Sequence, residues 1–395
     1  MNFHDTLDQP FVPVADSTLI SVEDLKGKLK EENQDIVFFT GAGFSKAWND
    51  CYPLGFALFS IDFEKDGDSY NFLTLANKLH ISRPSREIEN ELKSKLDAAS
   101  SELEKYILKE ELRVKNYDRQ CYNFLSEIKY HLDLYKKYPS IMPNFLDSTL
   151  ICGIECEIKL FVRSRFLELT KRDSPLDSSH SKSGNQDIVN FFCEINNANN
   201  SISFISTNYD FVIEKIFSGF GVEFFERGFI QREALKKTSW GKDETKIYKL
   251  NGGFEIFSSN SSYCIDYSRA KKKSPNPVEF STPSIIIPSQ EQDYSDRYFE
   301  NCFSKASNKL RVANKLVFIG YSLPIEDNAI RFLLKNFLDC PTHKLSNKEI
   351  IVISHNKADA LSVRERVMEV YPRLAEKDFA ITALEDGFTQ LVASI

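Results

Sequence analysis

Four short motifs combine glycines with polar side chains that could do chemistry. They are "TGAGFS" (40–45), "STNYD" (206–210), "KLNGG" (249–253) and "GYSLP" (320–324). Each follows an apolar run that is typical of a buried strand. In open α/β sheets, ligands bind beyond the carboxyl ends of the strands. The sequence therefore predicts that the four motifs meet at one ligand site.

The first two motifs each allow a chemical and a plain structural interpretation. Gly41 and Gly43 would let the backbone approach a phosphate at the start of a helix, but they equally suit a simple tight turn. The third glycine of the dinucleotide fingerprint is missing. Asn208 and Asp210 offer an amide and a carboxylate to a ligand, or they cap the helix that follows. Each motif alone is weakly specific.

Strands that alternate with helices must position these motifs. Strand-like runs occur at 35–40, 202–207, 222–228, 245–250, 283–288, 315–320 and 349–354, and a short strand and helix close the chain. This rhythm predicts an α/β fold: a Rossmann-like, mainly parallel sheet with helices on both faces. A helical insertion interrupts it. We expect an N-terminal arm and first part of the α/β domain in 1–59, the insertion in 60–185, and the rest of the domain in 186–395.

The insertion is rich in Leu, Lys and Glu. Apolar residues three or four apart predict an amphipathic helix over 86–116, whose charges indicate a solvated face rather than a ligand site. A second, more deeply buried helix is expected over 146–169, followed by a surface loop over 171–187.

Composition excludes several classes of protein. The 395 residues carry a net charge of -7, which argues against direct, sequence-specific nucleic-acid binding. We expect no membrane span and no signal peptide, because no long apolar run and no basic leader occur. Of eight cysteines, only Cys152 and Cys156 lie close together, and no second pair completes a zinc site. We expect reduced thiols, no metal and a cytoplasmic location. The 32 phenylalanines indicate a Phe-rich core or a subunit interface.

Taken in order, the four motifs resemble the sirtuin-like (silent-information-regulator-type) NAD-consuming domain, and within it the bacterial antiphage branch. The resemblance covers roughly 35–55 and 186–390. The zinc ribbon of the deacetylating branch is absent, and a helical insertion is present, as expected of the defence branch.

The resemblance implies that NAD, as the substrate, binds at the switch region of the sheet. Gly41, Ala42, Gly43 and Ser45 would hold the phosphates and the neighbouring ribose. Asn208 and Asp210 would orient the nicotinamide amide and the attacking group. The remaining expected contacts are Gly320, Tyr321 and Ser322 along the groove, and His355 and Asn356 near the adenosine ribose. For His355, a helix-capping or surface role is an equally good interpretation.

Asn251 stands where the family has a histidine that acts as the general base. An amide has no pKa near neutrality and cannot take that proton. Three explanations are open: an engineered inactive version, a natural enzyme that uses another base such as Asp210 or His355, or a natural NAD-sensing or scaffolding subunit.

The resemblance therefore implies an NAD+ glycohydrolase effector of antiphage defence, which would release nicotinamide and ADP-ribose. The alternative is a non-catalytic, NAD-binding regulatory or assembly subunit of a defence complex. Protein deacylation is a weaker third hypothesis, because the zinc ribbon and the histidine are missing. By family analogy we expect a homo-oligomer or a partner protein of the defence system, with 60–185 as the contact surface.

Overall fold

A computed structural model describes most of the chain. The described ranges are 19–66, 69–85, 102–171, 185–199, 201–219, 229–232, 237–240, 246–259, 262–267, 282–287, 289, 292–339, 348–371 and 380–393. The expected N-terminal arm therefore lies almost entirely outside the described residues, as does the predicted strand at 222–228.

A seven-stranded sheet forms the centre of the molecule, in the order β1-β11-β10-β9-β2-β3-β6. Every neighbouring pair in this sheet is parallel, which confirms the predicted fold class. Its strands are β1 (Leu19–Ile20), β2 (Asp35–Thr40), β3 (Ser201–Ser206), β6 (Lys246–Lys249), β9 (Lys315–Ile319), β10 (Glu349–Ile353) and β11 (Ala380–Leu384). From β2 the chain adds β3 and β6 on one side, then β9 and β10 on the other. The topological switch point therefore lies between β2 and β9.

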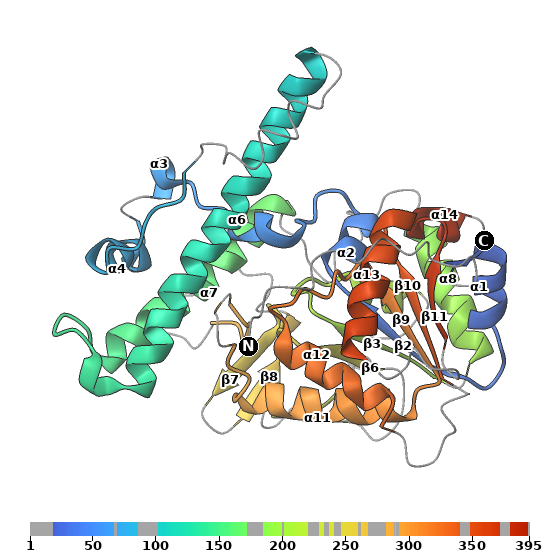
Figure 1. Cartoon of the computed structure of the whole chain (residues 1–395). Coiled ribbons are helices and arrows are strands. Elements are labelled where there is room, and N and C mark those ends of the chain that lie inside the picture. Colours follow the sequence, from blue (N-terminus) through green and yellow to red (C-terminus); the bar gives the residue numbers. More distant parts are fainter. Residues whose placement is uncertain are drawn as a thin grey trace, which may run out of the picture.

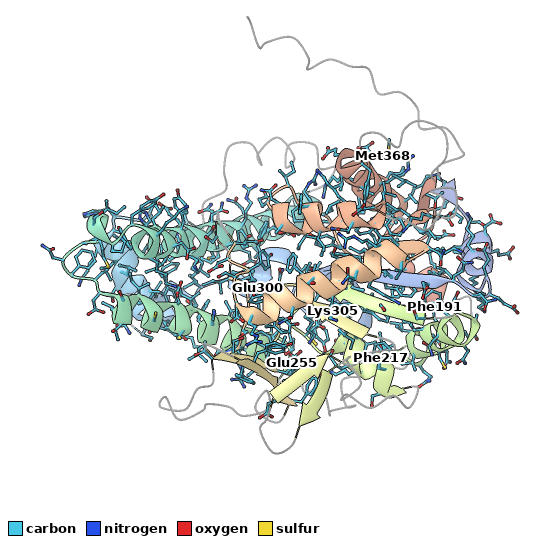
Figure 2. All side chains as sticks on the ribbon, turned by 90° about the horizontal axis from the view of Figure 1, so that it is seen from below. Phe191, Phe217, Glu255, Glu300, Lys305 and Met368 are labelled. Atoms are coloured by element: carbon cyan, nitrogen blue, oxygen red, sulfur yellow. The ribbon has the colours of Figure 1, made fainter. Side chains whose placement is uncertain are left out.

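Helices cover both faces of this sheet (Figure 1). One face packs against α1 (Val22–Leu29), α8 (Asn185–Ala198), α9 (Val212–Gly219) and α14 (Phe388–Ala393), and the other against α11 (Arg297–Val312), α12 (Asn328–Leu334) and α13 (Lys357–Val370). Side chains alternate along each strand: Phe38 stacks on Phe204 on the first face, while Phe39 meets Phe318 on the second. In Figure 2, Phe217 of α9 and Met368 of α13 lie on opposite sides of the sheet. The many phenylalanines thus fill two cores.

The described residues between β2 and β3 are mainly helical. It forms α2 (Ala42–Trp48), η2 (Gly55–Phe59), α3 (Phe63–Asp66), α4 (Asn71–Lys78), α6 (Glu102–Lys137), η3 (Pro139–Ile141) and α7 (Ser148–Leu169) before α8. The helices α6 and α7 extend away from the sheet (Figures 1 and 2). The predicted helix at 86–116 enters the described residues only from Glu102, and there it belongs to α6, which continues to Lys137.

One strand prediction is wrong. The run 283–288 forms only an isolated bridge, between Ile285 and Gly252. The N–H of Ser284 donates to the carbonyl of Ile256 in β7, and that of Ile286 to the carbonyl of Asn251 in the loop after β6, so neither joins the main sheet. Two antiparallel hairpins were not predicted: β4 (Phe229–Arg232) with β5 (Lys237–Trp240), and β7 (Ile256–Ser259) with β8 (Ser262–Ile265). Within the described ranges, no helix combines the length and apolar composition that a membrane span requires.

Candidate functional site

A cleft of about 1470 Å³ opens at the carboxyl edge of the sheet, beside the switch point. Nine of the predicted site residues line it: Ala42, Gly43, Asn208, Asp210, Asn251, Gly320, Tyr321, Ser322 and His355. Gly41, Ser45 and Asn356 do not. Typical small-molecule pockets measure roughly 300–1,000 Å³, so this cleft has room for a dinucleotide. We call the side formed by the loops after β2, β3, β6, β9 and β10 the sheet-edge wall.

The loops after β2 and β9 bond directly to each other. The N–H of Gly41 donates to Ile319 O at 3.2 Å, and that of Gly43 to Gly320 O at 2.9 Å. Gly320 has φ +60°, and a Cβ there would lie 2.3 Å from the backbone nitrogen of Phe44. These glycines are therefore required by loop packing. Phosphate binding by Gly41 and Gly43 remains a prediction, and both N–H groups already have partners within the chain.

Three polar side chains at the cleft form one network: Asn208 and Asp210 from the loop after β3, and Ser45 from α2. Asn208 Nδ2 donates to Gly41 O and to Ser45 Oγ, both at 2.8 Å, and Ser45 Oγ donates to Asp210 Oδ2 at 2.5 Å. The other oxygen of Asp210 accepts the N–H of Val212 at 3.0 Å, so it also caps α9, as the plainer interpretation predicted. Both N–H groups of the Asn208 amide are engaged. Its carbonyl oxygen is the atom left to meet a ligand.

A buried charge cluster supports the segment that leads to Asn251. Lys249 Nζ lies 2.9 Å from Glu214 Oε1, 2.9 Å from Glu255 Oε1 and 2.5 Å from Asp210 O. All three charged side chains are at most 1% exposed. Gly252, the residue directly after Asn251, has φ +81°, and a Cβ there would lie 1.9 Å from Ser284 O. The predicted turn is thus present, and it fixes the backbone on both sides of Asn251.

The side chain of Asn251 contacts a second set of polar groups. The Tyr294 hydroxyl lies 3.1 Å from Asn251 Oδ1 and 2.8 Å from Gln292 Oε1. Farther along the cleft, the Tyr321 hydroxyl donates to Asp327 Oδ2 at 2.5 Å. Burial and the nearby Glu326 raise the pKa of Asp327 above its usual value, against the opposing hydrogen bonds from Tyr321 and Gln292. None of Gln292, Tyr294 and Asp327 was expected from the sequence.

The two predicted residues after β10 take different places. Asn356 is the N-cap of α13 and accepts the N–H of Asp359 at 2.9 Å. His355 is exposed and lines the cleft. Nearby, Arg366 of α13 donates to Ser322 O at 2.5 Å. Arg366 therefore brings a positive charge to this end of the cleft, where a phosphate could use it.

The helix α6 forms the opposite side of the cleft, which we call the α6 wall. Its lining residues are Arg119, Gln120, Tyr122, Asn123, Ser126, Glu127, Tyr130 and His131. These positions recur in steps of three and four, so they occupy one helix face. Buried Cys121, Phe124 and Ile128 lie between them and face away from the cleft. The sequence carried this signal in "RQCYNFLSEIKYH", just beyond the predicted helix.

Among the described residues, no group of three or more His, Cys, Asp or Glu side chains is arranged to hold a metal. Cys152 and Cys156 both lie on α7 as free thiols, the first of them exposed.

Comparison with known proteins matches one family model to part of the chain. Residues 202–371 match the family model described as "SIR2-like domain", which spans β3, β6, β9 and β10 and three of the four motifs. This part of the chain, less than half of its length, is similar to SIR2-like domains. No curated protein matches the chain.

Solved structures similar to this SIR2-like chain include three Sir2 proteins. One is a Sir2 homologue in complex with NAD, at 9% identity and a TM-score of 0.38, covering 94% of this chain and 93% of that one. A mutant Sir2 with NAD and a p53 peptide has 10% identity and a TM-score of 0.40, covering 95% and 97%. A third, from a study of Sir2 mechanism and regulation, has 11% identity and a TM-score of 0.35, covering 96% and 95%.

Proposed function

We propose that this SIR2-like chain is an NAD+ glycohydrolase. It would cleave the bond between nicotinamide and ribose with water and release nicotinamide and ADP-ribose. The observation that carries the proposal is the network of Asn208, Ser45 and Asp210, set beyond the carboxyl ends of β2 and β3 in the central sheet. A dinucleotide fits the volume of the cleft, and Arg119 and Arg366 bring positive charge to its two sides.

Each residue of the network has a role that its contacts support. The fixed carbonyl oxygen of Asn208 would accept a hydrogen bond from the nicotinamide amide or a ribose hydroxyl. Asp210, just below, places negative charge near the sugar, where positive charge develops as the bond breaks. Asp210 is a poor candidate for the base, because both of its carboxylate oxygens already accept hydrogen bonds. Asn251 would face the same reaction centre without taking a proton.

Nicotinamide release from NAD, followed by chromatography, tests the proposal. We expect slow turnover by the chain with Asn251, because general-base assistance is worth roughly 10²–10⁴-fold and Asn251 cannot supply it. Asn251→His should raise turnover. If both proteins bind NAD in a calorimeter and neither releases nicotinamide, alone or with a partner protein, the glycohydrolase proposal is wrong.

The second candidate is a non-catalytic NAD-binding regulatory or assembly subunit. Asn251 favours this candidate, because the position at which the chain departs from the family is the one where catalysis needs a titratable side chain. NAD binding in the calorimeter without nicotinamide release from the natural sequence would support this role. The absence of binding would reject both candidates. An acyl-lysine peptide assay tests the weaker hypothesis of deacylation.

We further propose that the chain acts in the cytoplasm in antiphage defence, where NAD depletion would stop infected cells from supporting the phage. A toxic NAD consumer must be restrained before infection, so we expect a homo-oligomer or a defence partner that contacts the insertion at 60–185. The end of the α6–α7 pair presents four exposed apolar side chains: Tyr138, Ile141, Phe145 and Leu150. Native mass measurement and phage challenge of cells that express the chain test these two points.

A further inference from the structure

The segment that joins α6 to α7 gathers exposed apolar side chains. Among the described residues, ten large apolar side chains are at least 40% exposed. Three of them, Leu54, Phe56 and Ile325, line the cleft. Four others lie within 138–150, which we call the α6–α7 tip: Tyr138 at 48%, Ile141 at 58%, Phe145 at 41% and Leu150 at 40%. A cluster of apolar side chains on a protein surface marks an interaction site.

The α6–α7 tip is also basic. Lys78 Nζ lies 5.0 Å from the ring centroid of Phe145, and Lys137 Nζ lies 5.7 Å from that of Tyr138. Both aromatic rings of the tip therefore carry an ammonium group. The one acidic residue within 138–150 is Asp147, and its carboxylate caps α7 by accepting the N–H of Leu150 at 2.7 Å. A partner that fits this surface needs apolar side chains and negative charge.

The first 18 residues of the chain have this composition. The N-terminal segment, "MNFHDTLDQPFVPVADST" (1–18), contains three aspartates and neither lysine nor arginine. Its large apolar residues are Met1, Phe3, Leu7, Phe11, Val12 and Val14. The stretch "DQPFVPVAD" (8–16) places an apolar group between two aspartates. This segment is the longest stretch outside the described residues, and its charge is opposite to that of the tip.

The tip of the same chain is at the limit of what the segment can reach. Strand β1, which follows the segment, is an outermost strand of the sheet, four positions from β2, or roughly 19 Å. The helix α7 has 22 residues, so its tip end lies about 33 Å farther along its axis. The helix α1, directly after β1, lies on the opposite side of the molecule from the tip (Figure 1). Eighteen residues span at most about 60 Å, so only an almost fully extended segment could reach its own tip. A second copy of the chain can bring its tip to the segment directly.

We propose that the N-terminal segment of one copy binds the α6–α7 tip of a second copy. Its apolar residues pack on the four exposed side chains of the tip, and its aspartates lie near Lys78 and Lys137. Each copy offers one segment and one tip, so a reciprocal exchange closes a two-fold dimer. The inference rests on the proposed homo-oligomer and is independent of NAD cleavage.

The first test is native mass measurement of the full chain, of the chain without residues 2–18, and of Ile141→Asp. The natural chain should be a dimer. Ile141→Asp places a negative charge in the tip at a side chain that is 58% exposed, so the fold should be unchanged. We expect the dissociation constant of the dimer to rise by about tenfold or more in both variants. Phe332→Asp is the matched control: it changes a 72% exposed apolar residue of α12, and it should stay a dimer.

The second test uses a synthetic peptide of residues 1–18. Excess peptide should convert the natural dimer to monomer, because it occupies the tips. A peptide with asparagine at all three aspartate positions should need roughly tenfold higher concentrations, and added salt should narrow this difference. Fluorescence anisotropy of a labelled peptide measures binding to the chain without residues 2–18 and to the same chain with Ile141→Asp, which should bind at least about tenfold more weakly.

Three results would overturn the inference. A natural chain that is a monomer would reject the proposed homo-oligomer and the inference with it. A dimer that survives both the loss of residues 2–18 and Ile141→Asp would show that the copies meet through another surface, so only the inference would fail. Equal binding of the peptide with and without Ile141→Asp would place its site outside the tip. Nicotinamide release is measured separately, so a failure of the glycohydrolase proposal leaves these results unchanged.

Discussion

Along the sheet-edge wall, loops from different strands bond to one another, whereas the α6 wall is one face of one helix. The backbone of Gly43 donates to Gly320 across the switch point, and Lys249 joins Glu214, Glu255 and the carbonyl of Asp210. On the α6 wall, the lining side chains project from a single helix that extends away from the sheet (Figure 1). The sheet-edge wall is therefore suited to hold groups in fixed positions for chemistry. The α6 wall is suited to affinity and to the choice of ligand.

The two buried lysine clusters give the largest expected contrast. Lys249→Met should cost about 3–5 kcal/mol of unfolding free energy, because two almost fully buried carboxylates lose the cation they contact. Lys129 of α6 also contacts two carboxylates, Asp133 and Glu155, but these are 20% and 13% exposed. Glu155 also keeps its contact with Lys136. We expect Lys129→Met to cost only about 1 kcal/mol, and urea denaturation measures both. Equal losses would contradict the distinction between the walls.

Two asparagine substitutions, one in each wall, compare the walls by their effects on catalytic activity. Asn208→Ala removes an amide whose two N–H groups fix the loops after β2 and β3. We expect kcat to fall by roughly 10²–10³-fold, as for the loss of a preorganised hydrogen-bonding group. Asn123→Ala removes an exposed amide from the α6 wall, and we expect a change in KM of only about threefold. Steady-state nicotinamide release measures both constants. A larger effect at Asn123 on kcat would place chemistry on α6.

A pair of glycines tests whether the motif glycines serve packing. Gly320→Ala forces a Cβ into the backbone of the loop after β2 at a positive φ. We expect a loss of about 2–3 kcal/mol in stability and weaker NAD binding. Gly27→Ala lies inside α1, where a Cβ meets nothing within 4 Å, and it should instead stabilise the protein by about 1 kcal/mol. Thermal unfolding checks the opposite signs. Stabilisation by both changes would show that the loops can separate freely.

Much of the sheet-edge wall could be predicted from the sequence, because its residues lie in short motifs that each contain a strand end and the loop after it. An apolar run followed by glycines and a polar residue predicts a strand and its loop, and a parallel sheet places such ends on one edge. Eight of the predicted residues that line the cleft lie in motifs that those rules identified, and the ninth, His355, was expected only from the family resemblance. The run 283–288 misled the same rules, since an apolar run does not reveal that the N–H groups of Ser284 and Ile286 donate outside the main sheet.

The rest of the cleft depends on long-range placement that no local pattern encodes. Asn251 and Tyr294 meet across 43 residues, and the Tyr294 hydroxyl also contacts Gln292. Neither Gln292 nor Tyr294 belongs to a motif, so only the fold brings them to Asn251. The α6 wall had a periodic signal, but polar residues on one helix face are usually solvated. Only the position of the helix turns that face into the wall of a cleft.

The smallest expected effect is a loss of stability at low pH, at the contact between α6 and α7. Burial alone would raise the pKa of Glu155, but Lys129 and Lys136 together hold it below its usual value. A carboxyl group whose pKa is lowered by folding stabilises the protein above its unfolded pKa, and this contribution is lost as the pH falls through the folded pKa. The natural chain should therefore be more stable than Glu155→Gln at pH 7, by a few degrees in Tm, and the gap should close as the pH falls below about 4. Glu168→Gln, at a 56% exposed carboxylate near the other end of α7, is the matched control and should show little gap at either pH. A gap for Glu155→Gln that stays constant down to pH 3 would mean that packing, and not charge, holds the two helices together there.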